Sequence, residues 1–230
     1  MENLGGRVAK LKVLLLYPKF PETFWSFSNS LPFLGKRSAY PPLGLLTVSA
    51  MLPPHWERRL VDLNVEELRE QDLSWADVAF LSAMLVQAPS LSDLIARCRA
   101  SGLKTVVGGP IASAEHDAWR GADHVVQGEA EGILADLVRD LDAGRGRPRY
   151  ASRGWADMSR VPPPDLHLAR IGRYSAMPVQ YSRGCPFSCE FCDIIELFGR
   201  TPRTKAVEQV LLEFERLHEL GWRGSVFIVD

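Results

Sequence analysis

The first buried element of the chain is Lys12-Val13-Leu14-Leu15-Leu16-Tyr17. An apolar run this short, without polar alternation, is typical of a strand that is buried on both faces, as in a parallel sheet. Similar runs predict strands at residues 59–63, 78–83, 104–107 and 125–126, with helices between them at residues 43–52, 92–100 and 130–142. Such alternation indicates parallel βαβ units with right-handed crossovers. We therefore expect an α/β fold whose amino-terminal part is a flavodoxin-like (Rossmann-type) parallel sheet of five strands.

Ligands of open parallel sheets bind beyond the carboxyl ends of the strands. Three places in the sequence follow an expected strand: the loop after Tyr17, Ser82 at the end of the third strand, and Gly108-Gly109 after the fourth. These places hold the candidate binding residues of the amino-terminal part.

The composition is that of an ordinary globular chain. Of its 230 residues, 46% are hydrophobic and 24% are charged, and the net charge is -1. These values exclude disordered and collagen-like proteins. The longest strongly apolar stretch, residues 78–86, is far shorter than the ~20 residues that cross a bilayer. Residues 1–7 lack the apolar region of a secretory signal, so we expect no transmembrane segment and a cytoplasmic location.

Charge is distributed unevenly along the chain. Residues 145–205 contain eleven Arg and Lys against five Asp and Glu, a balance of +6. These arginines are interrupted by prolines and match no nucleic-acid-binding module, so an anionic small ligand is favoured over nucleic acid. The Arg-Gly-Pro-rich composition from residue 144 to 164 predicts irregular structure. We therefore expect a domain at residues 1–143, a linker at 144–174 and a second domain at 175–230.

Three of the four cysteines, Cys185, Cys189 and Cys192, fall within eight residues, while Cys98 stands alone on an expected helix. In a reducing compartment such a cluster favours metal binding or catalysis over a disulfide. The C-x3-C-x2-C spacing lets three thiolates converge on a small metal cluster. Three ligands suit an iron-sulfur cluster with one open iron, whereas structural zinc needs a fourth ligand. Zinc remains an alternative, with His167 and His218 as the nearest histidines.

The stretch Tyr181-Ser182-Arg183-Gly184-Cys185-Pro186-Phe187-Ser188-Cys189-Glu190-Phe191-Cys192 resembles the signature of radical S-adenosylmethionine enzymes. The resemblance implies that Cys185, Cys189 and Cys192 hold a 4Fe-4S cluster, whose open iron binds S-adenosylmethionine and cleaves it to a 5'-deoxyadenosyl radical. It also implies that Phe191 flanks the adenine. The alternative for Phe191 is an aromatic residue of the hydrophobic core.

The catalytic domain of that family is a full or partial TIM-type barrel. An expected strand at residues 178–182, a helix at 204–220 with Thr204 as its N-cap, and a strand at 225–229 are similar to its opening βαβ unit. The rest of the barrel has no counterpart before Asp230. We therefore expect an incomplete radical S-adenosylmethionine domain, which requires a longer product or a partner to cover its apolar faces.

Residues 12–142 are similar to the cobalamin-binding domain that precedes the radical domain in the group that includes the hopanoid methylases. The similarity is most specific at Leu81-Ser82-Ala83-Met84 and Gly108-Gly109-Pro110. The resemblance implies that Ser82 bonds the nucleotide tail of cobalamin and that Gly108 and Gly109 let the chain approach that tail. Residues 17–25 contain no histidine where many such domains carry D-x-H-x-x-G. We therefore expect that no protein imidazole from this loop binds cobalt.

Glu129 and Glu131 follow an expected strand and open an expected helix. There we interpret them as charges that favourably meet the positive end of the helix dipole. A general acid-base pair is the alternative, but the neighbouring sequence suggests no partner for either carboxylate.

The leading hypothesis is a cobalamin-dependent radical S-adenosylmethionine enzyme, expected to be a methyltransferase that acts on an unactivated carbon. Its cofactors would be a 4Fe-4S cluster, S-adenosylmethionine and cobalamin. Its partners would be a small-molecule or lipid substrate and an electron donor such as a ferredoxin or flavodoxin. The first alternative is an iron-sulfur or cobalamin-binding module for electron transfer or sensing, and the second is a zinc-stabilised interaction domain.

Overall fold

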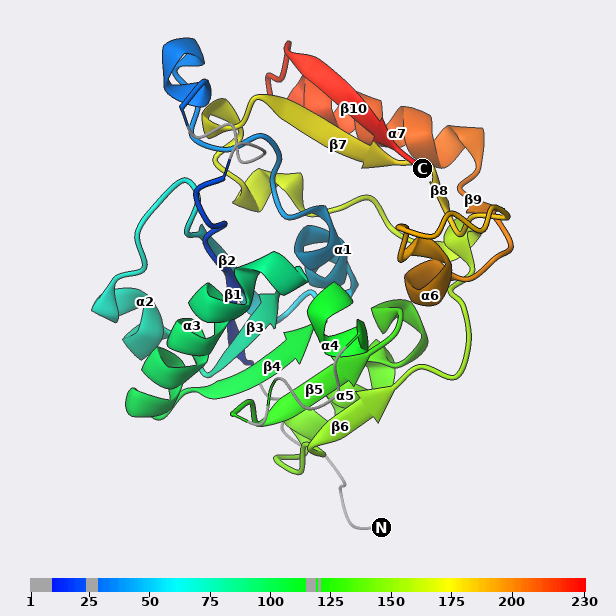
Figure 1. The fold of residues 1–230 in the computed structure, drawn as a ribbon. Helices are drawn as coiled ribbons and strands as arrows, with labels where there is room; N and C mark the ends of the chain where they lie inside the picture. The colour runs from blue at the N-terminus through cyan, green and yellow to red at the C-terminus, as the bar shows by residue number, and fades with distance from the viewer. Residues whose placement is uncertain (1–9, 24–28, 115–118, 120) are drawn as a thin grey trace.

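The computed structural model describes residues 10–23, 29–114, 119 and 121–230. Its main element is a parallel sheet of six strands in the order β2-β1-β3-β4-β5-β6 (Figure 1). The strands are β1 (Lys12–Tyr17), β2 (Glu57–Asp62), β3 (Val78–Ser82), β4 (Lys104–Gly108), β5 (His124–Gln127) and β6 (Arg149–Ala151). The expected α/β fold and the flavodoxin-like order of the first five strands are confirmed.

Strand β1 is the second strand of this order, with a neighbouring strand on each side, and its apolar side chains are buried on both faces of the sheet. Val13 and Leu15 pack into one hydrophobic cluster, and Leu14 and Leu16 pack into the other. This division follows from the two-residue period of a strand. The chain leaves β1 for β2 on one side and returns to β3 on the other. The resulting switch point is where an open α/β sheet binds its ligand.

Helices cover both faces of the sheet. Helices α1 (Leu43–Met51) and α5 (Leu134–Asp142) contribute to the first cluster, while α3 (Ala88–Ala100) and the short helices α2 (Glu70–Trp75) and α4 (Pro110–Ala114) contribute to the second. Helix α1 ends before Pro53, which cannot continue a helical ladder. The helix expected at residues 130–142 is divided into a 3-10 turn, η4 (Ala130–Gly132), and α5, because Ile133 between them has a non-helical φ of -134°.

Residues 144–174 are more ordered than a linker. Strand β6 lies within them and pairs with β5, so the expectation of irregular structure is wrong there. The physical reason is Tyr150, whose ring is buried while its hydroxyl donates to Asp140 Oδ2 at 3.1 Å. A buried aromatic with a satisfied hydroxyl stabilises this edge strand in a segment of otherwise unfavourable composition.

The second part of the chain contains β7 (Ala176–Gln180), β8 (Ser182–Arg183), α6 (Ile194–Phe198), β9 (Arg203–Thr204), α7 (Val207–Glu219) and β10 (Ser225–Val229). Strands β7 and β10 pair in parallel with α7 between them in the chain, which confirms the expected opening βαβ unit. The expectation that Thr204 caps the helix is wrong. Thr204 pairs with Ser182 in the ladder between β8 and β9, and Ala206 is the N-cap residue.

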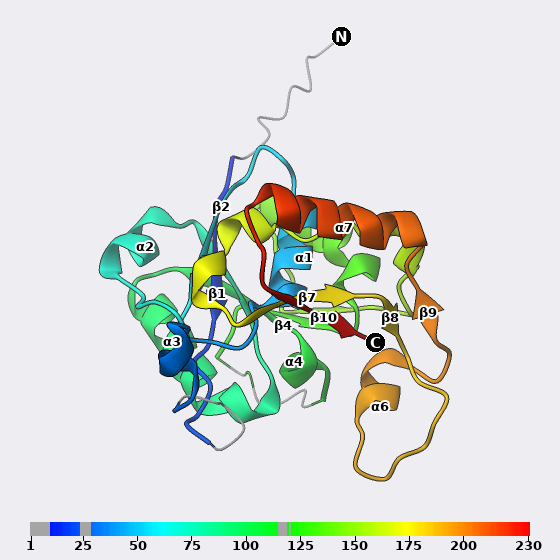
Figure 2. The same cartoon turned by 90° about the horizontal axis from the view of Figure 1, so that it is seen from above.

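The two parts share one hydrophobic core. Met177, Val179 and Leu217 belong to the same cluster as Val13 and Leu15. Viewed from above, β7 and β10 pass in front of α1 (Figure 2). The ring of Tyr40, just before α1, lies 5.2 Å from that of Phe227 on β10. Helix α7 and strand β10 still expose apolar side chains: Val207, Leu211, Phe227 and Ile228. Among the described residues, no helix is long and apolar enough to cross a membrane.

Candidate functional site

A cavity of about 450 Å³ lies where the strands of the main sheet end. It lies between these strand ends, α1, and the β7–β10 pair, and most of its lining is apolar. Tyr17, Ser82, Gly108, Gly109 and Gly128 line it from the main sheet, and Pro178, Gln180, Arg183, Leu197, Phe198 and Phe227 line it from the second part of the chain. The structure thus brings together the strand-end residues singled out from the sequence.

Gly109 is a position in this cavity where a side chain is excluded. Its φ is +83°, and a Cβ atom there would lie 2.3 Å from Ser82 Oγ. The next turn is held by the N–H of Ile111, which donates to the carbonyl of Ala83 at 3.1 Å. Gly108 has more room, since its nearest neighbours would be atoms of Val126 at 3.7 Å. The two glycines therefore differ. At Gly109 the left-handed backbone and the closeness of Ser82 exclude a side chain, whereas at Gly108 the absence of a side chain leaves space in the cavity.

The three clustered cysteines lie on one loop, residues 184–202, between β8 and β9. Cys189 is exposed, Cys185 and Cys192 are half-buried, and all three are free thiols. Their sulfur atoms are not gathered: the described part of the chain contains no group of three His, Cys, Asp or Glu side chains placed to hold a metal ion. Phe191 is 90% exposed, which contradicts its alternative as a core aromatic residue. Cys98, by contrast, is fully buried, and burial raises the pKa of its thiol to about 11.

The two ends of this cysteine loop are tied together at its base. Arg183 pairs with Arg203 in the antiparallel ladder of β8 and β9. Gly184 has a φ of +92°, and a Cβ atom there would lie 2.4 Å from the carbonyl oxygen of Thr201. The N–H of Cys185 donates to the carbonyl of Gly199 at 3.1 Å. The loop is therefore closed at the residues that immediately flank its first cysteine.

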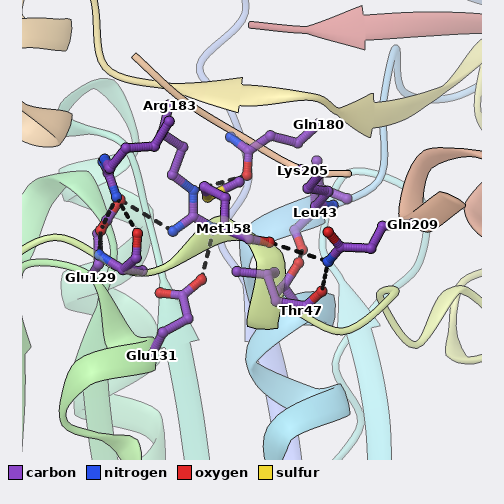
Figure 3. Close-up of polar contacts among 12 residues, drawn as sticks. Leu43, Thr47, Glu129, Glu131, Met158, Gln180, Arg183, Lys205 and Gln209 are labelled. Atoms are coloured by element: carbon purple, nitrogen blue, oxygen red, sulfur yellow. Dashed lines mark hydrogen bonds and ion pairs between the residues drawn. The ribbon is translucent and has the colours of Figure 1, made fainter. Parts of the chain in front are cut away.

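Glu129 joins this loop base to the main sheet, through partners that the neighbouring sequence does not suggest. Its side chain is 2% exposed and accepts hydrogen bonds from Arg203 Nη1 at 2.8 Å and Nη2 at 3.0 Å. Arg183 Nη1 lies 3.3 Å from the same carboxylate, and the N–H of Ala156 also donates to it. Glu131 accepts from Arg183 Nη2 at 2.8 Å (Figure 3). Both glutamates thus bind arginines from the second part of the chain.

Glu129 and Arg183 are charged at neutral pH. Burial by itself would raise the pKa of Glu129, but the hydrogen bonds from Arg203 and the Ala156 N–H, with the charge of Arg183, bring the pKa below its usual value. Burial would likewise lower the pKa of Arg183, but Glu131 and Glu129 raise it overall. Charge-assisted, bidentate contacts of this kind are the stronger hydrogen bonds in proteins. Glu129 and Arg203 are 74 residues apart in the sequence, so local sequence patterns do not predict that they pair.

Known proteins resemble this chain over nearly its whole length. The family model described as the B12 binding domain matches residues 37–138. An uncharacterized methyltransferase, sll1242, from Synechocystis sp. is 43% identical over 96% of this chain and 41% of its own length. The hopanoid C-2 methylase of Rhodopseudomonas palustris is 36% identical over the full chain and 44% of its own length. The chain therefore spans less than half the length of these curated relatives.

A solved structure shares the fold. The radical S-adenosylmethionine methyltransferase TsrM from Kitasatospora setae, determined with cobalamin and a 4Fe-4S cluster bound, superposes with a TM-score of 0.70. The match covers 96% of this chain and 48% of that structure at 14% sequence identity. At this identity the likeness establishes the arrangement of helices and strands, which includes both the six-stranded sheet and the βαβ unit beside it.

Proposed function

We propose that the chain is the cofactor-binding part of a cobalamin-dependent radical S-adenosylmethionine methyltransferase, in the group of B12-binding-domain proteins that includes the hopanoid C-2 methylase. In this proposal residues 1–143 bind cobalamin, residues 144–174 connect, and residues 175–230 begin the radical domain. The reaction proposed for the whole protein is methylation of an unactivated carbon.

One observation carries the proposal. A single cavity is lined on one side by the strand ends at Ser82, Gly108 and Gly109, and on the other side by Leu197 and Phe198 from the cysteine loop. The position expected for cobalamin and the loop expected to hold the cluster therefore border the same space. Two cofactors that must act on one substrate require such proximity.

The cavity has the chemistry that the nucleotide tail of cobalamin needs. Its lining is mostly apolar and includes Phe80, Val106 and Leu137, which suit a flat aromatic group, together with Ser82, which carries a hydroxyl. The left-handed turn at Gly109 leaves the main chain without a side chain at this point. Ser82, Gly108 and Gly109 are the residues that we propose contact the tail.

The cysteine loop supplies a donor set suited to an iron-sulfur cluster. Cys185, Cys189 and Cys192 are free and reachable from solvent, and three thiolates leave one iron open to S-adenosylmethionine. When bound, the cluster supplies the electron that cleaves S-adenosylmethionine, and cobalamin carries the methyl group. The exposed ring of Phe191, one residue before Cys192, is available to flank the adenine.

A small-molecule or lipid substrate and an electron donor such as a ferredoxin or flavodoxin complete the proposal. The first alternative, a module that binds the cofactors for electron transfer or sensing, differs in that no substrate is methylated. The second alternative, a zinc-stabilised interaction domain, differs in the metal itself.

Metal analysis tests the proposal first. After anaerobic reconstitution we expect about four iron and four sulfide ions per chain, together with a change in the paramagnetic spectrum of the reduced cluster when S-adenosylmethionine is added. Stoichiometric zinc without iron or sulfide would support the zinc-stabilised domain instead. A cluster that forms but does not respond to S-adenosylmethionine would support the electron-transfer alternative.

A further inference from the structure

We propose that Glu129 is a positioning residue that couples the cobalamin cavity to the cysteine loop, so that a ligand in the cavity and order in the loop strengthen one another. This inference rests on the proposed function for the identity of the ligand. The coupling itself rests on the contacts of Glu129 and can be measured independently.

On the loop side, Glu129 holds the residue that organises the base of the loop. Arg203 binds the Glu129 carboxylate and also donates to the carbonyl of Phe198 at 2.9 Å and to that of Ala156 at 2.7 Å. Phe198 lies within the cysteine loop and Ala156 lies in the connecting segment. One guanidinium therefore ties the loop, the connection and the main sheet together, and Glu129 is the acceptor that balances its charge.

On the cavity side, Glu129 is fixed to the wall itself. Gly128 and Glu129 both line the cavity, and Gly128 has a φ of +76°. The N–H of Gly128 donates to Ser113 Oγ at 3.0 Å, so this turn is anchored to α4. A ligand that fills the cavity restricts this turn, and through it the direction of the Glu129 carboxylate.

Coupling of this kind is reciprocal. If cavity occupancy orders the loop by a given factor, then an ordered loop raises the affinity of the cavity by the same factor. Glu131 provides a comparison within the same turn, because it binds Arg183 whereas Arg203 binds Glu129, and because its side chain is more exposed than that of Glu129. The proposal therefore assigns the coupling to Glu129 rather than to acidic charge in general.

Hydrogen exchange of the chain without cofactors is the first arm of the test. Glu129→Gln keeps the shape of the side chain but removes its charge, and we expect exchange in residues 184–204 to become about tenfold faster, within the range of ordinary coupling energies. Glu131→Gln is the control within the turn. Asp140→Asn is the matched control outside the turn. It also removes the charge of a carboxylate that binds an arginine, since Asp140 accepts a hydrogen bond from Arg147 Nε at 2.8 Å. Both controls should change exchange in this loop by less than about threefold.

Hydroxocobalamin provides the second arm. It should slow exchange of residues 184–204 in the wild-type chain, and this slowing should be lost in Glu129→Gln even at saturating cofactor. If Glu129→Gln does not fold, Arg203→Lys keeps the positive charge, loses the bidentate contact and should show the same local change.

Equal exchange in wild type and Glu129→Gln, or an equal effect of Asp140→Asn, would overturn the inference. Cobalamin-dependent slowing that persists in Glu129→Gln would also overturn it. If the wild-type chain binds no cobalamin, the proposed function fails, while the first arm still decides whether Glu129 positions the loop.

Discussion

Tyr174 and Asp62 lie 112 residues apart in the chain, yet the Tyr174 hydroxyl donates to Asp62 Oδ2 at 2.9 Å in the buried core. Asp62 ends β2, and its other carboxylate oxygen accepts from the N–H of Asn64 at 2.8 Å. Burial raises the pKa of Asp62, although the bonds from Asn64 and Tyr174 oppose that shift. The bond fixes the end of residues 144–174 to the main sheet, directly before β7 begins.

The first prediction follows from this bond. Tyr174→Phe removes a donor from a buried acceptor and should lower the free energy of unfolding by about 1–3 kcal/mol. Because the raised pKa makes the folded state bind more protons than the unfolded state, the contribution of Asp62 to stability falls as pH rises from the usual pKa of 3.8 through the folded pKa. The hydrogen bond from Tyr174 stabilises the ionised carboxylate of Asp62, and Tyr174→Phe removes it. The difference in the free energy of unfolding between wild type and Tyr174→Phe should therefore grow as pH rises. Urea unfolding between pH 5 and 8 measures it, and a difference that shrinks with rising pH would contradict this account.

The second prediction concerns the paired glycines. Gly109→Ala forces a side chain into a left-handed conformation and against Ser82 Oγ, so it should destabilise the chain by about 1–3 kcal/mol and weaken hydroxocobalamin binding at least tenfold. Gly108→Ala meets only ordinary contacts and should leave stability nearly unchanged, whereas Gly108→Leu should block binding by filling the cavity. Thermal unfolding and absorbance titration separate the two effects. Equal tolerance of alanine at both positions would show that the turn is not needed.

The third prediction separates the cysteines. Cys189→Ala should abolish the iron-sulfur cluster after anaerobic reconstitution, and Cys185→Ala and Cys192→Ala should do the same. Cys98→Ala is the matched control, because Cys98 is buried among apolar residues of the main sheet and should affect only stability. Iron and sulfide analysis gives the answer. Full cluster content in Cys189→Ala would remove the basis for the iron-sulfur assignment.

Local patterns were sufficient to predict much of the fold. The apolar run of β1 and the alternation of strands with helices both indicate local structure that the chain adopts. Ser82, Gly108 and Gly109 were placed at one cavity because strand ends in a parallel sheet meet at the same edge.

The errors have one physical cause: long-range contacts outweigh local composition. Strand β6 forms in a segment rich in Gly, Pro and Arg because the hydroxyl of Tyr150 donates a hydrogen bond to Asp140. Thr204 becomes part of a strand because Ser182 pairs with it. The partners of Glu129, Arg183 and Arg203, come close to it only in the tertiary fold. These two arginines flank the cysteine cluster in a basic segment, which was a signal in the sequence that they need an acidic partner.

The central claim is that cobalamin binds in this cavity without a nitrogen ligand from the protein. Among the described residues no histidine lines the cavity, and His124 is at the opposite end of β5, where its Nδ1 lies 2.7 Å from the carbonyl oxygen of Arg147. His116 lies outside the described residues. A nucleotide tail bound in the cavity would also hold its benzimidazole away from cobalt.

The most direct measurement is the paramagnetic spectrum of the Co(II) cofactor bound to the wild-type chain. We predict a base-off spectrum without nitrogen hyperfine coupling, unchanged in His124→Gln and in His116→Gln. Clear nitrogen coupling, or no detectable binding of cobalamin, would contradict the account.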